Sequence, residues 1–132
     1  MKKLLFSFLI LMTGIIAQSN AQAINCKKFK NGTFKMTYQG KSGIIKRNGN
    51  TQDEYFDGSK IPTMSFTVKW LDECTYTLDP TAATRKRNPA IPKDGIMTVK
   101  ITKTTANSYF CAASFNSDKN KIYESEMILV AK

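Results

Sequence analysis

Apolar and polar residues alternate along most of the chain beyond residue 32, which is the pattern of β-strands that bury one face. The clearest case is the segment 63–71, in which Phe66, Val68 and Trp70 fall on one face and polar residues fall on the other. The same reasoning predicts eight strands, over 33–38, 44–47, 51–56, 63–71, 74–78, 97–102, 108–115 and 122–131.

Residues that favour turns separate these segments. Asn48 and Gly49 form the strongest hairpin signal, because both residues tolerate a positive φ. Further turns are expected at 40–43, 57–59 and 116–120. The segment 81–94, which contains two prolines, is the one long irregular connection that the pattern predicts, and no segment after residue 23 has a convincing helical period.

Short strands at regular spacing predict an all-β domain, either an antiparallel barrel or a β-sandwich. Connections of hairpin length favour an up-and-down meander that forms a closed or partly open, lipocalin-like barrel. Because the predicted strands are short, we expect side chains to fill the barrel rather than leave a wide ligand cavity.

The first 23 residues have the three parts of a secretory signal peptide. Lys2 and Lys3 precede an apolar run from residue 4 to 17, and residues 21–23 (AQA) form a cleavage site before Ile24. We therefore expect a signal peptide over 1–23 and one exported domain over 24–132, in the periplasm or outside the cell. No later segment is apolar enough to form a transmembrane helix. Asn25 disfavours lipidation of the cysteine that follows it.

Three cysteines allow one internal disulfide and one free thiol. An oxidising compartment permits a disulfide, and Cys111 lies in an apolar stretch where a buried thiol is the ordinary interpretation. We therefore predict a Cys26–Cys74 disulfide. Cys111 could alternatively pair between two chains.

Composition argues against several kinds of chemistry. The chain has 132 residues and no histidine, so it lacks the commonest general base and the commonest metal ligand. It contains no glycine-rich nucleotide-binding motif, and no two cysteines have C-x-x-C spacing. The acidic pairs at 53–54 and 72–73 are weak candidates for glycosidase carboxylates. Neighbouring strand residues point to opposite faces, and the pair 72–73 lies in a turn, where acidic residues are common. We predict no catalytic residues, no cofactor and no metal.

Basic residues outnumber acidic ones, with 20 Lys and Arg against 10 Asp and Glu. Removing Lys2 and Lys3 lowers the formal net charge of +10 by two. Arg85, Lys86, Arg87 and Lys93 cluster in the irregular segment and could bind an anionic envelope surface; a solvated loop is the plainer interpretation. Because this segment has no aromatic residue for base stacking, nucleic acid is disfavoured as a partner.

Three aromatic residues are candidates for a ligand pocket or for the core. Phe66, Trp70 and Tyr76 lie at alternating strand positions near Cys74, where large aromatic side chains usually fill the core. Alternatively, these three side chains would line a pocket for a small apolar ligand.

Three stretches resemble a family of small secreted proteins of Bacteroidetes, especially flavobacteria. They are residues 26–34 (CKKFKNGTF), 45–54 (IKRNGNTQDE) and 68–76 (VKWLDECTY). The resemblance spans most of the chain after residue 23 but fails in 81–94 and at Cys111. Members often carry the label "DNA topoisomerase IV". That activity needs an ATPase, an acidic metal cluster and a nucleophilic tyrosine in a very large chain. This short chain has none of these contexts, so the label does not describe its activity. The resemblance itself implies no activity.

Three functions therefore remain open. The leading expectation is a non-enzymatic exported domain with a structural or interaction role at the cell envelope. The alternative is a lipocalin-like carrier of a small apolar molecule. A third is an enzyme or inhibitor that acts through loops without a known motif.

Overall fold

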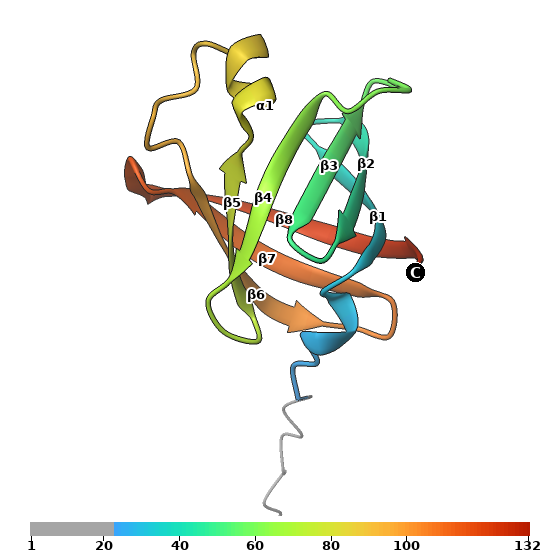
Figure 1. The fold of residues 1–132 in the computed structure, drawn as a ribbon. Helices are drawn as coiled ribbons and strands as arrows, with labels where there is room; N and C mark the ends of the chain where they lie inside the picture. Colours follow the sequence, from blue (N-terminus) through green and yellow to red (C-terminus); the bar gives the residue numbers. More distant parts are fainter. Residues whose placement is uncertain (1–22) are drawn as a thin grey trace, which may run out of the picture.

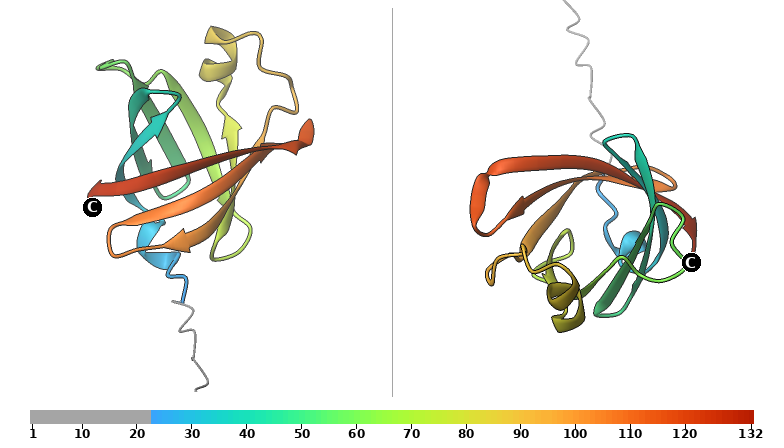
Figure 2. Two further views of the ribbon diagram at one scale, coloured as in Figure 1. Left: turned by 180° about the vertical axis from the view of Figure 1, so that it is seen from behind. Right: turned by 90° about the horizontal axis from the view of Figure 1, so that it is seen from above.

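A computed structural model describes residues 23–132, so the expected signal peptide lies, except for its last residue, outside the described residues. Eight antiparallel strands form a closed barrel in sequence order, and the last strand pairs with the first (Figures 1 and 2). The strands are β1 (Gly32–Tyr38), β2 (Lys41–Asn48), β3 (Thr51–Phe56), β4 (Met64–Trp70), β5 (Thr75–Pro80), β6 (Met97–Thr104), β7 (Ser108–Phe115) and β8 (Asp118–Ala131). The predicted all-β up-and-down barrel is confirmed.

Two short helices mark the two ends of the barrel. The 3-10 helix η1 (Lys27–Phe29) precedes β1, and the α-helix α1 (Ala82–Arg87) follows β5. Figure 1 shows them at opposite ends of the molecule, with α1 at the top and η1 in blue at the bottom. We call the end at η1 the plugged end, because Phe29 of this helix is fully buried, and the end at α1 the open end.

The alternation of the sequence places the core inside the barrel. Phe34 of β1 pairs with Ile45 of β2, and both side chains are fully buried. On the opposite wall, Val99 and Ile101 of β6 are buried while Lys100 between them is exposed. Side chains two residues apart on a strand share a face, so one apolar face per strand suffices to build this core.

The structure corrects the predicted boundaries of two hairpins. The turn expected at 40–43 is confined to Gln39 and Gly40, both with positive φ, and β2 already begins at Lys41. Gly43 lies within β2, where an added Cβ would overlap the Phe56 ring. Strand β8 begins in the polar segment that was expected to be a turn, at Asp118, and is 14 residues long.

The segment 81–94 is not wholly irregular, since it contains α1. Thr81 caps the helix by accepting a hydrogen bond from the Thr84 amide at 3.2 Å. The Thr84 side chain is fully buried, donates to the Ser65 carbonyl at 2.9 Å and accepts from the Ser65 amide at 2.8 Å. A helix of six residues is too short to show a 3.6-residue period, which explains why the sequence pattern missed it.

The predicted Cys26–Cys74 disulfide is present, and Cys111 is free and buried. The disulfide ties the chain just before η1 to the loop between β4 and β5, so it fixes the plug to the barrel wall. No helix among residues 23–132 combines the length and apolar character needed to cross a membrane.

Candidate ligand-binding cavity

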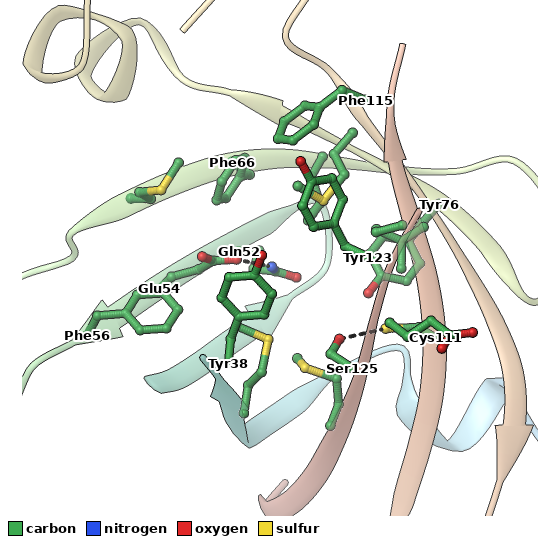
Figure 3. Close-up of a pocket in the computed structure, with 18 residues that line it drawn as sticks. Tyr38, Gln52, Glu54, Phe56, Phe66, Tyr76, Cys111, Phe115, Tyr123 and Ser125 are labelled. Carbon is green, nitrogen blue, oxygen red and sulfur yellow. Dashed lines mark hydrogen bonds between the residues drawn. The ribbon is translucent and has the colours of Figure 1, made fainter. Parts of the chain in front are cut away.

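A partly open cavity of about 330 Å³ lies inside the barrel. All strands except β2 contribute to its wall (Figure 3). The lining residues are Met36, Tyr38, Gln52, Glu54, Phe56, Met64, Phe66, Tyr76, Leu78, Met97, Val99, Cys111, Ala113, Phe115, Tyr123, Glu124, Ser125 and Met127. The wall is therefore mainly apolar and aromatic, as in sites for small organic ligands.

This cavity corrects the expectation that side chains fill the barrel. The prediction relied on short strands, but β8 has 14 residues and begins four residues before the predicted segment 122–131. The inward positions Cys111, Ala113 and Ser125 on these strands also carry small side chains. Small residues on one wall leave space that the aromatic residues of the opposite wall do not fill.

Aromatic side chains lie on strands that reach the open end. The Tyr38 and Tyr123 ring centroids are 6.5 Å apart, and the Phe115 ring meets Tyr123 edge to face at 5.9 Å. Phe56 adds a fourth ring at the end of β3. We call these four residues the aromatic rim. A rim of this kind would stack on a flat or apolar ligand.

A chain of polar side chains runs from the plugged end to the cavity. Arg47 Nε donates to Gln52 Oε1 at 2.7 Å, and Gln52 Nε2 donates to Glu54 Oε1 at 2.9 Å. Gln52 and Glu54 occupy alternate positions of β3 and so point to the same, inward face. Figure 3 shows the two side chains next to each other in the cavity wall.

Arg47 is the centre of the plugged end and is only 2% exposed. Its guanidinium donates to the hydroxyls of Tyr76 and Tyr109, each at 2.9 Å, and to the Phe29 carbonyl at 3.2 Å. It also lies over the Tyr76 ring, 4.4 Å from the centroid. Burial disfavours its charge, yet the two tyrosines raise the pKa of Arg47 above its ordinary value. We call Phe29, Arg47, Tyr76 and Tyr109 the plug cluster.

Glu54 is an acidic residue of the cavity wall whose pKa is shifted by its surroundings. Its side chain is half-buried among apolar neighbours, and this desolvation raises the pKa of Glu54 to about 7 despite the Gln52 hydrogen bond and the charge of Arg47. None of the ion pairs among residues 23–132 includes Glu54 or Arg47. The cavity therefore holds a carboxyl group that lies near the balance between its two protonation states at neutral pH.

Cys111 does not have the surroundings of a catalytic thiol. Burial raises the pKa of this thiol, and its hydrogen-bond partner is the Ser125 hydroxyl at 3.3 Å, which is not a base. A reactive cysteine needs a neighbour that stabilises its thiolate. Residues 23–132 also contain no group of three or more His, Cys, Asp or Glu side chains placed to hold a metal.

Only two of the three aromatic residues that were singled out from the sequence line the cavity. Phe66 and Tyr76 line the cavity. Trp70 is not part of its wall; this ring packs against Tyr76 with centroids 4.6 Å apart and lies under the Lys30 ammonium group. Trp70 therefore supports the plugged end from outside the cavity.

The four basic residues of the segment 81–94 do not form one anion site. The Arg85 guanidinium is held by contacts within the protein: it pairs with Asp79 at 2.9 Å and donates to the Pro80 and Pro92 carbonyls. Lys86, Arg87 and Lys93 are exposed beside the open end. Arg85 therefore holds the segment against the barrel and leaves the other three cations free to meet solvent.

The acidic pair on β3 separates as the strand pattern predicts, and the second pair lies in the turn between β4 and β5. Asp53 accepts a hydrogen bond from the Ser65 hydroxyl on the outer side of the barrel, while Glu54 faces the cavity. Asp72 caps its own turn by accepting from the Cys74 amide, which lowers the pKa of Asp72. Asp53 and Glu54 therefore cannot act as two converging carboxylates, and the exposed Glu73 pairs with Lys27 at 3.0 Å.

Sequence reasoning did not identify Arg47 and Gln52 as site residues, and it considered Glu54 only as a weak candidate for a glycosidase carboxylate. The signal was present in the hairpin of β2 and β3, where Arg47 pairs directly with Gln52 and Glu54 follows on the same face. Three consecutive inward polar positions on one hairpin, in a barrel whose inward residues are mainly apolar or aromatic, indicate a site. Comparison of the chain with protein-family models, with curated proteins and with solved structures found no match.

Proposed function

We propose that this protein is a non-enzymatic carrier that binds a small apolar molecule inside its barrel. The cavity of about 330 Å³ carries the proposal, because a domain with a purely structural role has no need of an unfilled core. The volume lies at the lower end of the range for small-molecule sites. The ligand is therefore small, with the aromatic rim around its exposed end.

Export of the carrier fits the same proposal. The Cys26–Cys74 disulfide is typical of proteins in oxidising compartments, and the sequence before Ile24 has the pattern of a secretory signal. A carrier outside the cytoplasm would protect an apolar molecule from water during transfer. A structural or interaction role at the envelope is the competing proposal, supported by the exposed cations Lys86, Arg87 and Lys93.

Binding can be tested with Nile red, a neutral apolar dye whose fluorescence increases in apolar surroundings. We expect the wild-type protein to bind the dye and Ala113→Phe to lose most of this binding, because Ala113 lines the cavity. Ala112→Phe is a matched control: Ala112 is the preceding residue of β7 and so points to the outer face. It should bind dye like the wild type.

Circular dichroism and a thermal melt establish that each variant is folded. Ala113→Leu replaces Ala113→Phe if the larger ring prevents folding. Equal dye binding by the variants of Ala112 and Ala113 would place the dye outside the barrel and contradict the carrier proposal. Native mass spectrometry of the protein exported by its own signal peptide, compared with a denaturing spectrum, would then reveal any natural ligand as a mass lost on denaturation.

A further inference from the structure

We propose that the cavity selects apolar molecules that carry one protonated amine, and that Glu54 binds the ammonium group. This inference rests on the proposed carrier function and specifies its ligand class. It follows from the distribution of charge in the barrel, from the free carboxylate oxygen of Glu54 and from the position of Arg47.

Basic side chains are absent from the lining of the cavity although they are abundant in the sequence. Lys and Arg outnumber Asp and Glu two to one in the sequence, yet no Lys or Arg lines the cavity. Its only charged side chains are Glu54, within the wall, and Glu124, which is exposed to solvent. A fatty acid or another anion would therefore meet carboxylates and no cation. The lining favours a ligand that is neutral or positive.

Glu54 has an oxygen free to meet a ligand. Its Oε1 accepts the hydrogen bond from Gln52, and its Oε2 has no hydrogen-bond partner within residues 23–132. Every buried side-chain nitrogen or oxygen of these residues does have a hydrogen-bond partner. Because Oε2 has no partner, it is not a buried atom, and it is accessible from the cavity. Figure 3 shows the Glu54 carboxylate in the cavity wall, with Gln52 on one side and Phe56 on the other.

Arg47 cannot neutralise Glu54 directly. Gln52 lies between them, and the guanidinium is already occupied by Gln52, two tyrosine hydroxyls and the Phe29 carbonyl. Gln52 orients the carboxylate, because its amide oxygen is held by Arg47 and its amide nitrogen is left to donate to Glu54. The arrangement fixes an acceptor in an apolar wall, and the charge of Arg47 acts on it without a direct ion pair.

A protonated amine supplies the missing charge. Burial raises the pKa of Glu54 to about 7, which means that the ionised carboxylate is costly in the empty cavity. An ammonium group within hydrogen-bond distance stabilises the ionised form and gains a charge-assisted bond. The other titratable groups of the wall are Tyr38, Tyr76, Cys111, Tyr123 and Glu124. None of them is a cation that could replace the amine.

Three ligands of equal chain length test the inference: decylammonium, decanol and decanoate, each titrated by calorimetry at pH 7.5. We expect the wild-type protein to bind decylammonium most tightly and decanoate least. In Glu54→Gln, affinity for decylammonium should fall by about 10-fold or more, since a hydrogen bond between charged groups is lost. Affinity for decanol should change by less than about threefold, since burial of its chain is unaffected.

Asp53→Asn is the matched control, because Asp53 precedes Glu54 on β3 but lies on the outer side of the barrel; it should keep the preference for decylammonium. A second measurement does not depend on any variant. At pH 6.5 the binding of decylammonium should release protons from Glu54 of the wild-type protein, seen as a binding heat that depends on the ionisation enthalpy of the buffer. Decanol should release none.

The outcomes separate the two proposals. If decanol binds as tightly as decylammonium and no proton is released, the amine inference is wrong while the carrier function stands. Tight binding of decanoate would lead to the same conclusion. If none of the three ligands and no Nile red binds, both proposals fail.

Discussion

Arg47 has an unusual environment for a buried cation. Most buried charges are paired with an opposite charge, yet this guanidinium is held by neutral acceptors and by the face of the Tyr76 ring. The two tyrosine hydroxyls also contact each other at 3.1 Å, so the plug cluster is a closed hydrogen-bond network. Gln52 lies between Arg47 and Glu54, so the half-buried carboxylate of Glu54 has no directly paired cation.

The carboxyl group of Glu54 makes stability depend on pH. Its pKa of about 7 in the folded protein exceeds the ordinary value of 4.5. Between these values the folded protein binds more protons than the unfolded chain, so the free energy of unfolding should decrease as the pH rises through this window. The full shift corresponds to at most about 3 kcal/mol, and solvent in the cavity reduces that amount.

Urea unfolding at pH 5 and pH 8 measures this effect in the wild type and in Glu54→Gln. The glutamine variant has no titrating group at the position, so its free energy of unfolding should decrease less over the same pH range. Glu124→Gln serves as the control and should follow the wild type. Parallel pH profiles for the wild type and Glu54→Gln would show that Glu54 keeps its ordinary pKa in the folded protein.

At the scale of elements, α1 is positioned by one buried hydroxyl. Thr84 reaches from the helix to β4 and satisfies both the amide and the carbonyl of Ser65. The Thr81 amide also donates to the Ser65 carbonyl, at 3.0 Å. The Ser65 amide therefore depends on Thr84, while the carbonyl has a second partner.

Replacing Thr84 by valine keeps the shape of the side chain and removes the hydroxyl. The half-buried Ser65 amide then loses its partner, which should lower the free energy of unfolding by about 1–3 kcal/mol. Thr102→Val is the comparison, because the Thr102 hydroxyl is exposed and makes only a 3.3 Å contact with a carbonyl. Chemical denaturation of both variants measures the difference. A similar small loss in both would mean that solvent replaces Thr84 at Ser65.

The sequence was a good guide to the strands and a poor guide to the site. Alternation identified all eight strands, because each has one face in the same core, and Ser108–Phe115 was predicted to the residue. The helix α1 was missed since it depends on the contact of Thr84 with β4, which no local pattern encodes. The cavity was expected only as the alternative to a filled core, because it arises where Ala113 and Ser125 of neighbouring strands come together.

At the scale of the whole molecule, the barrel has one sealed and one open end. The plug cluster fills the end at η1, and the disulfide attaches that end of the chain to the loop after β4. In the proposed carrier, a ligand would enter at the aromatic rim, the end at which α1 lies (Figure 1). The sealed end would then limit how deep the ligand can go, and Glu54 lies between the seal and the rim.

The disulfide should therefore contribute to the stability of the whole barrel. It joins residues 48 apart in the sequence, and the loop-entropy model gives about 4 kcal/mol for a loop of that size. Denaturation of the double variant Cys26→Ala/Cys74→Ala should show a loss of this order, with reduced binding of Nile red because η1 is no longer anchored. Cys111→Ser, which keeps the disulfide, is the control. A double variant as stable as the wild type would mean that packing of Phe29 alone holds the plug.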